Sequence, residues 1–254
     1  MNNVEIDNCY EKWLLCCDDA EQTELKALED NQIEDAFFRE LAFGTGGLRG
    51  KLGLGPNRLN VYTVGKATQG LADYLNSTFE NPTVALCRDT RHGSEEFVHR
   101  AAEVLAGNGI KSHLFERVEP TPALSFAVRE LGCSAGVNIT ASHNPRQWNA
   151  LKFLNAEGEF LSDAEGKRVL ALAEDENFVF PDVDHIGKVV SRESYNDEHI
   201  RRVLALPLVD AEAVRKRHFK VIVDAVNSVG GIVIPKLLRE LGCEVVELNC
   251  AEKR

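Results

Sequence analysis

The first 43 residues carry apolar side chains at roughly helical spacing, with acidic residues between them. The apolar positions are Trp13, Leu14, Leu25, Leu28, Ile33, Phe37, Phe38 and Leu41. This pattern predicts a helical N-terminal arm, residues 1–43, that packs on the body of the protein. Nothing in the arm suggests a chemical role.

Beyond the arm, short apolar runs alternate with amphipathic segments. Strands are predicted at 83–87, 111–115, 135–139 and 151–154, and helices at 61–78, 94–108, 121–131 and 163–173. Ser94 is expected to be the N-cap of its helix. Strands that alternate with helices predict an α/β fold in which the helices cover the sheet.

A polar stretch, residues 176–196, is expected to connect this unit to a second one. A helix near 196–205 is followed by a strand at 218–224, a helix at 232–241 and a strand at 244–248. A single βαβ unit cannot bury both faces of its sheet. The second α/β domain is therefore predicted to be incomplete.

Composition narrows the class of protein. The chain has 254 residues, of which 44% are hydrophobic and 27% charged, and its formal net charge is -11. This charge argues against nucleic acid or an anionic membrane as the main partner, although a local basic pocket still suits a small anionic substrate. No run is long enough to span a bilayer and the N-terminus is polar, so we expect a cytoplasmic protein without a membrane partner. The seven cysteines show no metal-ligand spacing, which predicts reduced thiols.

Residues 43–55 read FGTGGLRGKLGLG and contain six glycines with Arg49 and Lys51 among them. Such a segment can present backbone N–H groups to an anion, because glycine permits positive φ and close backbone approach. It can equally be a flexible turn between the arm and the body. The pattern is neither a Walker loop nor a dinucleotide-binding fingerprint.

A polar loop follows the predicted strand at 135–139. It contains Thr140, Ser142, His143 and Asn144 and ends at an Asn-Pro step, which favours a turn. In open α/β sheets, ligands bind at the carboxyl ends of the strands. Ser142 is therefore the candidate nucleophile, although serine and asparagine beside a proline are also common structural residues of turns.

The residues near Ser142 favour phosphoryl transfer over the acyl transfer of a serine hydrolase. Adjacent side chains on an extended loop usually diverge, so His143 is not the expected triad base, and the GxSxG elbow of a serine hydrolase is missing. Phosphoryl transfer instead needs cations and a positioned oxygen. Arg49 and Lys152 can supply the charge, and Arg88 and Arg91, after another predicted strand, are further candidates.

The motif TASHNPxxxNxxK, preceded about ninety residues upstream by FGTGGLRG, resembles the α-D-phosphohexomutase superfamily. This group includes phosphoglucomutase, phosphomannomutase, phosphoglucosamine mutase and phosphopentomutase-like enzymes of carbohydrate metabolism. RDTR and VDAVN also match family segments. The resemblance implies a three-layer α/β/α domain I with a mixed sheet, residues 44–190, and the start of a truncated domain II, residues 191–254.

The resemblance also implies a reaction. Ser142 matches the serine that is phosphorylated in the resting enzyme and that donates its phosphoryl group to a hexose phosphate. The sugar bisphosphate then reorients and returns its other phosphoryl group, so that phosphate moves between C1 and C6. A Mg²⁺ ion binds a phosphoserine oxygen. The expected partners are the sugar bisphosphate and a glucose, mannose or glucosamine phosphate.

Further roles follow from the same match. Arg49 and Lys152 correspond to the residues that neutralise the transferred group, and His143 corresponds to a residue that shapes the serine loop or takes part in catalysis. Substrate or loop support is expected from a further set: Thr45, Asn144, Arg88 and Arg91.

The chain departs from the family pattern in several places. Ala150 replaces a usual glycine, which suggests that this position does not need positive φ, and Asn227-Ser228 replaces an Asn-Gly turn. The acidic metal loop DGDxDR, the sugar-discriminating loop and the C-terminal phosphate-gripping domain are absent from the sequence. Negligible activity is therefore expected of the isolated chain, and a non-catalytic, phosphoserine-bearing domain fragment is the alternative from another class.

The two halves of the chain resemble different branches of the family. The arm and residues 40–146 resemble the phosphoglucomutase/phosphomannomutase branch, whereas residues 147–250 are closer to phosphoglucosamine mutase. A natural sequence, a gene fusion and an engineered sequence all fit this pattern. The sequence specifies neither the preferred sugar nor the oligomeric state.

Overall fold

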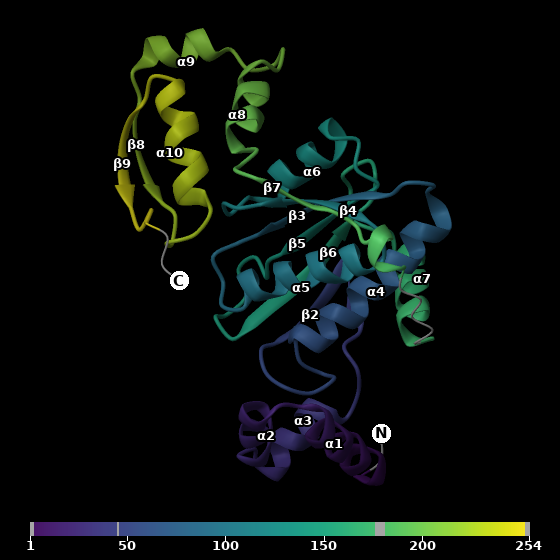
Figure 1. The fold of residues 1–254 in the computed structure, drawn as a ribbon. Coiled ribbons are helices and arrows are strands. Elements are labelled where there is room, and N and C mark those ends of the chain that lie inside the picture. The colour runs from purple at the N-terminus through teal and green to yellow at the C-terminus, as the bar shows by residue number, and fades with distance from the viewer. Residues whose placement is uncertain (1–2, 45, 176–180, 252–254) are drawn as a thin grey trace.

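The computed structural model describes residues 3–44, 46–175 and 181–251. The helices predicted for the arm are present, as α1 (Asn3–Cys16), α2 (Asp19–Lys26) and α3 (Asp30–Phe37). They enclose a small core of their own around Leu25 and Phe37, which are fully buried. Figure 1 shows the arm as a separate group of helices below the sheet.

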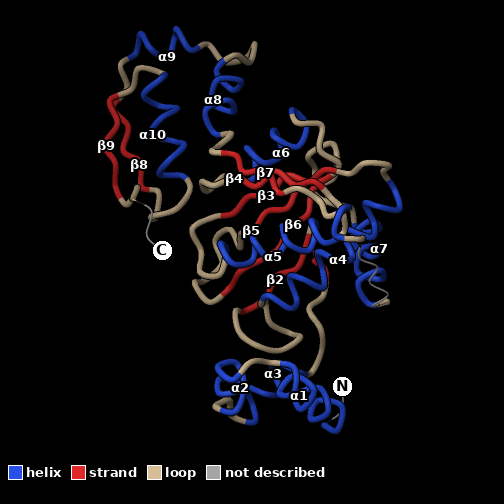
Figure 2. The backbone as a smooth tube through the Cα atoms, in the orientation of Figure 1, coloured by secondary structure: helices blue, strands red, loops and turns tan. Residues whose placement is uncertain are grey.

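The body is built on a seven-stranded sheet with the order β1-β2-β6-β5-β3-β4-β7. The strands are β1 (Phe43–Gly44), β2 (Gly47–Lys51), β3 (Thr83–Arg88), β4 (Lys111–Phe115), β5 (Ala135–Ile139), β6 (Trp148–Leu154) and β7 (Val189–Arg192). The β3, β4, β5 and β7 strands run parallel, whereas β6 is antiparallel to both β5 and β2. The predicted mixed sheet is therefore confirmed. Figure 2 shows its strands in red at the centre of the body.

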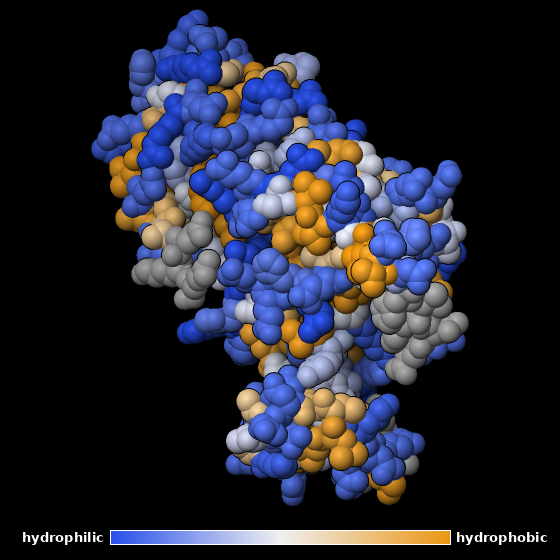
Figure 3. Space-filling view, in the orientation of Figure 1, coloured by the Kyte–Doolittle hydropathy of each residue, from blue (hydrophilic) through white to orange (hydrophobic). Residues whose placement is uncertain are grey.

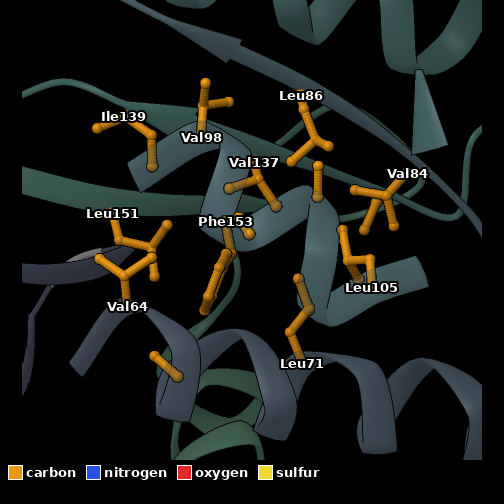
Figure 4. Close-up of a cluster of buried hydrophobic side chains, with 14 of the residues drawn as sticks. Val64, Leu71, Val84, Leu86, Val98, Leu105, Val137, Ile139, Leu151 and Phe153 are labelled. Atoms are coloured by element: carbon orange, nitrogen blue, oxygen red, sulfur yellow. The ribbon is translucent and has the colours of Figure 1, made fainter. Parts of the chain in front are cut away.

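Helices cover both faces of this sheet, as the α/β/α prediction requires. On one face, α4 (Val61–Thr78), α5 (Ser94–Gly107) and α7 (Asp163–Glu174) enclose the main hydrophobic core. Figure 4 shows labelled side chains of α4 and α5 meeting those of β3, β5 and β6 there. On the other face, α6 (Thr121–Glu130) packs on β3 and β5 through a smaller cluster.

In three places the structure adds to or corrects the local predictions. Of the two interpretations of the glycine-rich segment, the flexible turn is excluded for residues 47–51, which form β2 and pair with β6. The polar stretch 176–196 is not only a connection, because it contains a short 3-10 helix (Val183–His185) and the edge strand β7. Gly93 rather than Ser94 is the N-cap of α5, since the Ser94 hydroxyl donates to Asp89 Oδ1 at 2.8 Å.

The C-terminal unit contains α8 (Asn196–Leu204), α9 (Ala211–Arg217), β8 (Lys220–Asp224), α10 (Gly230–Glu240) and β9 (Glu244–Leu248). The two strands pair in parallel, and α10 packs against them. Ile222 on β8 is 65% exposed, so one face of this small sheet is open, as expected for a lone βαβ unit. The face of the molecule in Figure 3 is mostly hydrophilic, with hydrophobic areas on the body and on the N-terminal helices.

The contact between α4 and α7 depends on a glycine. A Cβ atom on Gly70 would lie 2.2 Å from the Val169 carbonyl oxygen, so the two helices approach backbone to backbone. Gly70→Ala is expected to lower the free energy of unfolding by about 3 kcal/mol, since the helices must separate. Gly65→Ala on the same helix is the control, because its Cβ atom would come no nearer than 3.7 Å to a neighbour.

The control is expected to raise the free energy of unfolding by about 0.5–1 kcal/mol through helix propensity alone. Urea unfolding of both variants measures the difference. Equal stabilities would contradict the close α4–α7 contact.

Candidate active site

Ser142 adopts a backbone conformation that serine rarely takes. Its φ is +54°, in the left-handed region, on the loop that joins β5 to β6. The Ser142 N–H donates to Thr140 Oγ1 at 3.2 Å, and the serine side chain is exposed. A non-glycine residue held in this region costs about 1–2 kcal/mol, and such strain is often found at functional sites.

Arg91 binds the backbone of this loop. Its guanidinium group donates to the carbonyl oxygens of Ser142 at 2.7 Å and Asn144 at 2.6 Å. It also donates to the carbonyl oxygens of Pro145 and Trp148, each at 3.1 Å. One planar side chain therefore ties both ends of the loop together, and the loop conformation depends on it.

A buried polar network of Asp89, Ser94 and Asn149 holds Arg91 in place. The Asp89 carboxylate lies 3.5 Å from Arg91 Nε and accepts hydrogen bonds from the Arg91 N–H and the Ser94 hydroxyl. Asn149 Nδ2 donates to Ser94 Oγ at 2.9 Å and to the His92 carbonyl oxygen at 3.0 Å. Sequence reasoning missed these supporting residues, although Asp89 and Asn149 both lie inside the quoted motifs.

Two cations lie near each other across the β2–β6 pair. Gly47 pairs with Lys152 and Arg49 with Ala150, so both charged residues are on the same face of the sheet. Arg49 Nη1 also lies 3.4 Å from Asn144 Oδ1 in the serine loop. Burial of Lys152, and then the charge of Arg49, lower the pKa of the lysine.

Glycine makes this close pairing possible. A Cβ atom on Gly47 would lie 2.0 Å from the Leu151 carbonyl oxygen. Ala150, by contrast, is in regular β6 and does not have positive φ, as its replacement of the family glycine suggested. Both residues are thus compatible with one antiparallel pair that presents Arg49 toward the loop.

The remaining predicted site residues are His143, Arg88 and Thr45, and for two of them the structure shows contacts that the sequence did not predict. His143 Nδ1 lies 3.4 Å from Ser142 Oγ, so the expectation that these adjacent side chains diverge is wrong. Arg88 pairs with Glu95 at 3.6 Å and also contacts the Asp89 carbonyl oxygen, whereas Arg91 binds the backbone of the serine loop. Thr45 lies outside the described residues.

The described ranges contain no group of three or more His, Cys, Asp or Glu side chains that could hold a metal ion. Nor does the described part of the chain contain a helix long and apolar enough to cross a membrane. The cysteines are all free thiols. A cavity of about 620 Å³ lies between α1, α4 and α7, away from Ser142, and no predicted site residue lines it.

The fold and this site define a class: an α/β domain with a strained serine on a loop at the end of a strand. Arg49 contacts this loop through Asn144, and Lys152 lies on the same face of the β2–β6 pair as Arg49. The family description "Phosphoglucomutase/phosphomannomutase, alpha/beta/alpha domain I" matches residues 40–180, and the description of domain II matches residues 197–254. The chain belongs to the phosphoglucomutase/phosphomannomutase family.

Individual relatives agree with this assignment. The chain is 35% identical over 227 residues to a phosphoglucomutase of Staphylococcus haemolyticus, an alignment that covers 85% of this chain and 41% of the relative. It is 48% identical over 128 residues to a phosphoglucomutase of Staphylococcus aureus, covering 50% of this chain and 23% of the relative. The chain thus spans less than half the length of the curated relatives it matches.

Solved structures show the same fold. A putative phosphomannomutase from Thermus thermophilus superposes with a TM-score of 0.74 and 26% identity, over 85% of this chain and 47% of that one. A phosphoglucomutase/phosphomannomutase family protein from Burkholderia thailandensis gives a TM-score of 0.69 at 22% identity, over 83% and 44%. The second likeness concerns the fold alone.

Proposed function

We propose that Ser142 is the phosphoryl carrier of a phosphohexomutase that moves phosphate between C1 and C6 of a hexose phosphate through a sugar bisphosphate. One observation carries the proposal. Ser142 is exposed in a strained conformation on a loop that Arg91 ties down, beside Arg49. Glucose or mannose phosphate is the proposed substrate, in keeping with the family, and the expected location remains the cytoplasm.

In phosphoryl transfer the protein acts mainly by positioning the reacting groups and neutralising their charge. When the Ser142 hydroxyl attacks a phosphorus atom of the bisphosphate, the O–P bond to the sugar breaks, and the sugar oxygen leaves and takes up a proton from water to become a hydroxyl. Arg49 and Lys152 neutralise charge on the transferred group. His143 Nδ1, 3.4 Å from Ser142 Oγ, accepts the hydroxyl proton in the tautomer that leaves this nitrogen free.

Mg²⁺ is part of the proposal, bound to an oxygen of phosphorylated Ser142. The described residues supply no carboxylate cluster around this loop, so they do not by themselves fit a complete magnesium site. The ion would neutralise phosphoryl charge. The steps above rely only on the residues of this chain.

Other members of the family remain alternatives. A phosphoglucosamine mutase or a phosphopentomutase-like enzyme would use the same serine on a different sugar. A non-catalytic, phosphoserine-bearing domain is the alternative from another class.

Intact-mass measurement tests the proposal. Incubation of the chain with glucose 1,6-bisphosphate and Mg²⁺ is expected to add one phosphoryl group. The same incubation with EDTA measures how far this uptake depends on the metal. An unmodified mass with Mg²⁺ present would contradict the role of Ser142. Stable phosphorylation in EDTA would contradict the role of the metal.

A further inference from the structure

Phe160 lies on a short return segment after β6 that the serine motif does not include. The chain reverses at Asn155, whose N–H donates to the Glu159 carbonyl oxygen at 2.8 Å and whose side-chain oxygen accepts from the Glu159 N–H at 3.0 Å. The turn is fastened to α6, because the Ser125 hydroxyl donates to the Gly158 carbonyl oxygen at 2.6 Å. The position of Phe160 is thus fixed by two elements.

This return segment brings the phenyl ring to Lys152. Phe160 forms an antiparallel bridge with Leu154, which is on the same face of β6 as Lys152. The Lys152 Nζ atom lies 5.3 Å from the centre of the ring. The ring also packs against Gly46, which directly precedes β2, since a Cβ atom on Gly46 would lie 2.8 Å from Phe160 Cγ.

Phe160 does not contribute to the hydrophobic core. Phe160 is 42% exposed and is not a member of the buried clusters. A single exposed apolar side chain is ordinary by itself. What sets Phe160 apart is its contact with a half-buried ammonium group that belongs to the candidate site.

The ring opposes the effects that disfavour the charge on Lys152. Burial, and then the nearby Arg49, lower the pKa of the lysine, whereas Asp89 raises it. The face of an aromatic ring carries negative charge density and attracts a cation. Phe160 therefore favours the charged form of Lys152 and restricts where its ammonium group lies.

We propose that Phe160 is a positioning residue whose ring holds the Lys152 ammonium group on the sheet face shared with Arg49, ready to neutralise a phosphoryl group at Ser142. This inference rests on the proposed function of that site. It assigns no contact between Phe160 and the transferred group. Phe160 acts only through Lys152.

The test compares Phe160→Leu with Phe160→Tyr in the full chain. Leucine keeps apolar cover over Lys152 but removes the ring face, whereas tyrosine keeps the ring. Carbon-13 NMR of labelled lysine gives the titration midpoint of Lys152, and intact-mass kinetics with glucose 1,6-bisphosphate and Mg²⁺ give the rate of phosphoryl transfer. The control is Phe219→Leu, at a position that is 45% exposed and has Arg217 at 5.8 Å from its ring.

For Phe160→Leu we expect the midpoint of Lys152 to fall by about half a pH unit, the shift that a surface cation–π contact supports. The charge is then lost earlier as the pH rises, so the alkaline limb of the transfer rate moves to lower pH. At neutral pH the transfer rate should fall about three- to fivefold, for loss of the same contact. Phe160→Tyr and the Phe219→Leu control should match the parent chain.

An unchanged midpoint in Phe160→Leu, or a shift that Phe160→Tyr does not restore, would overturn the positioning role even if transfer is observed. Absence of transfer in the parent chain would instead overturn the proposed function. In that event the NMR titration still decides whether Phe160 holds Lys152. The two failures are therefore distinguishable.

Discussion

Ser142→Ala is expected to abolish phosphoryl uptake from glucose 1,6-bisphosphate. The variant removes the only atom that the proposed reaction modifies, while the loop keeps its ties to Arg91. Intact-mass measurement should show the unmodified chain at every time point. Ser77→Ala, at an exposed serine near the end of α4, is the matched control and should label fully.

A second substitution at the same position separates function from stability. Because Ser142 has φ of +54°, Ser142→Gly relieves the left-handed strain and should raise the free energy of unfolding by about 1 kcal/mol. It should also abolish phosphoryl uptake. Labelling of either variant at the parent rate would contradict the role of the serine, and a destabilised glycine variant would contradict the strain.

Arg91→Lys is expected to slow phosphoryl transfer to Ser142 by about 10- to 100-fold, because small misplacements of reacting groups cost that much. A lysine has one nitrogen and cannot reach the four carbonyl oxygens that the guanidinium group binds. The change also weakens the partner of the buried Asp89 carboxylate, so the free energy of unfolding should fall by about 2 kcal/mol. Intact-mass kinetics and urea unfolding measure the two effects.

Arg100→Lys, on α5, is the matched control for this experiment. Arg100 pairs with Glu103 at 3.3 Å, and the two side chains are 44% and 66% exposed. Such a pair contributes little, so its conservative replacement should change stability by less than about 0.5 kcal/mol and leave transfer nearly unchanged. Equal effects of the two replacements would show that the loop does not depend on the Arg91 contacts.

The pattern of hydrophobic and polar residues was sufficient to predict most helices and strands of the fold. The helix predicted at 61–78 has those bounds in α4, and the apolar run at 111–115 is β4. The strands that were missed lack this signal. The glycines of β2 have no side chains to show alternation, and β7 is a four-residue edge strand whose residues are all at least partly exposed.

For the candidate site, sequence reasoning selected residues but not their arrangement. Ser142 could be identified from its position at a strand end. The proximity of Arg49 and Lys152 depends on pairing between strands about a hundred residues apart, which no local pattern specifies. Likewise, the RDTR motif did not reveal that Arg91 binds the loop backbone while Arg88 turns to Glu95.

The most direct test of this account is the location of the phosphoryl group after the chain has reacted with glucose 1,6-bisphosphate and Mg²⁺. Tandem mass spectrometry of the peptides gives that location. Phosphate is expected on Ser142 and on no other residue. Phosphate on His143 or on any other side chain, with Ser142 unmodified, would contradict it.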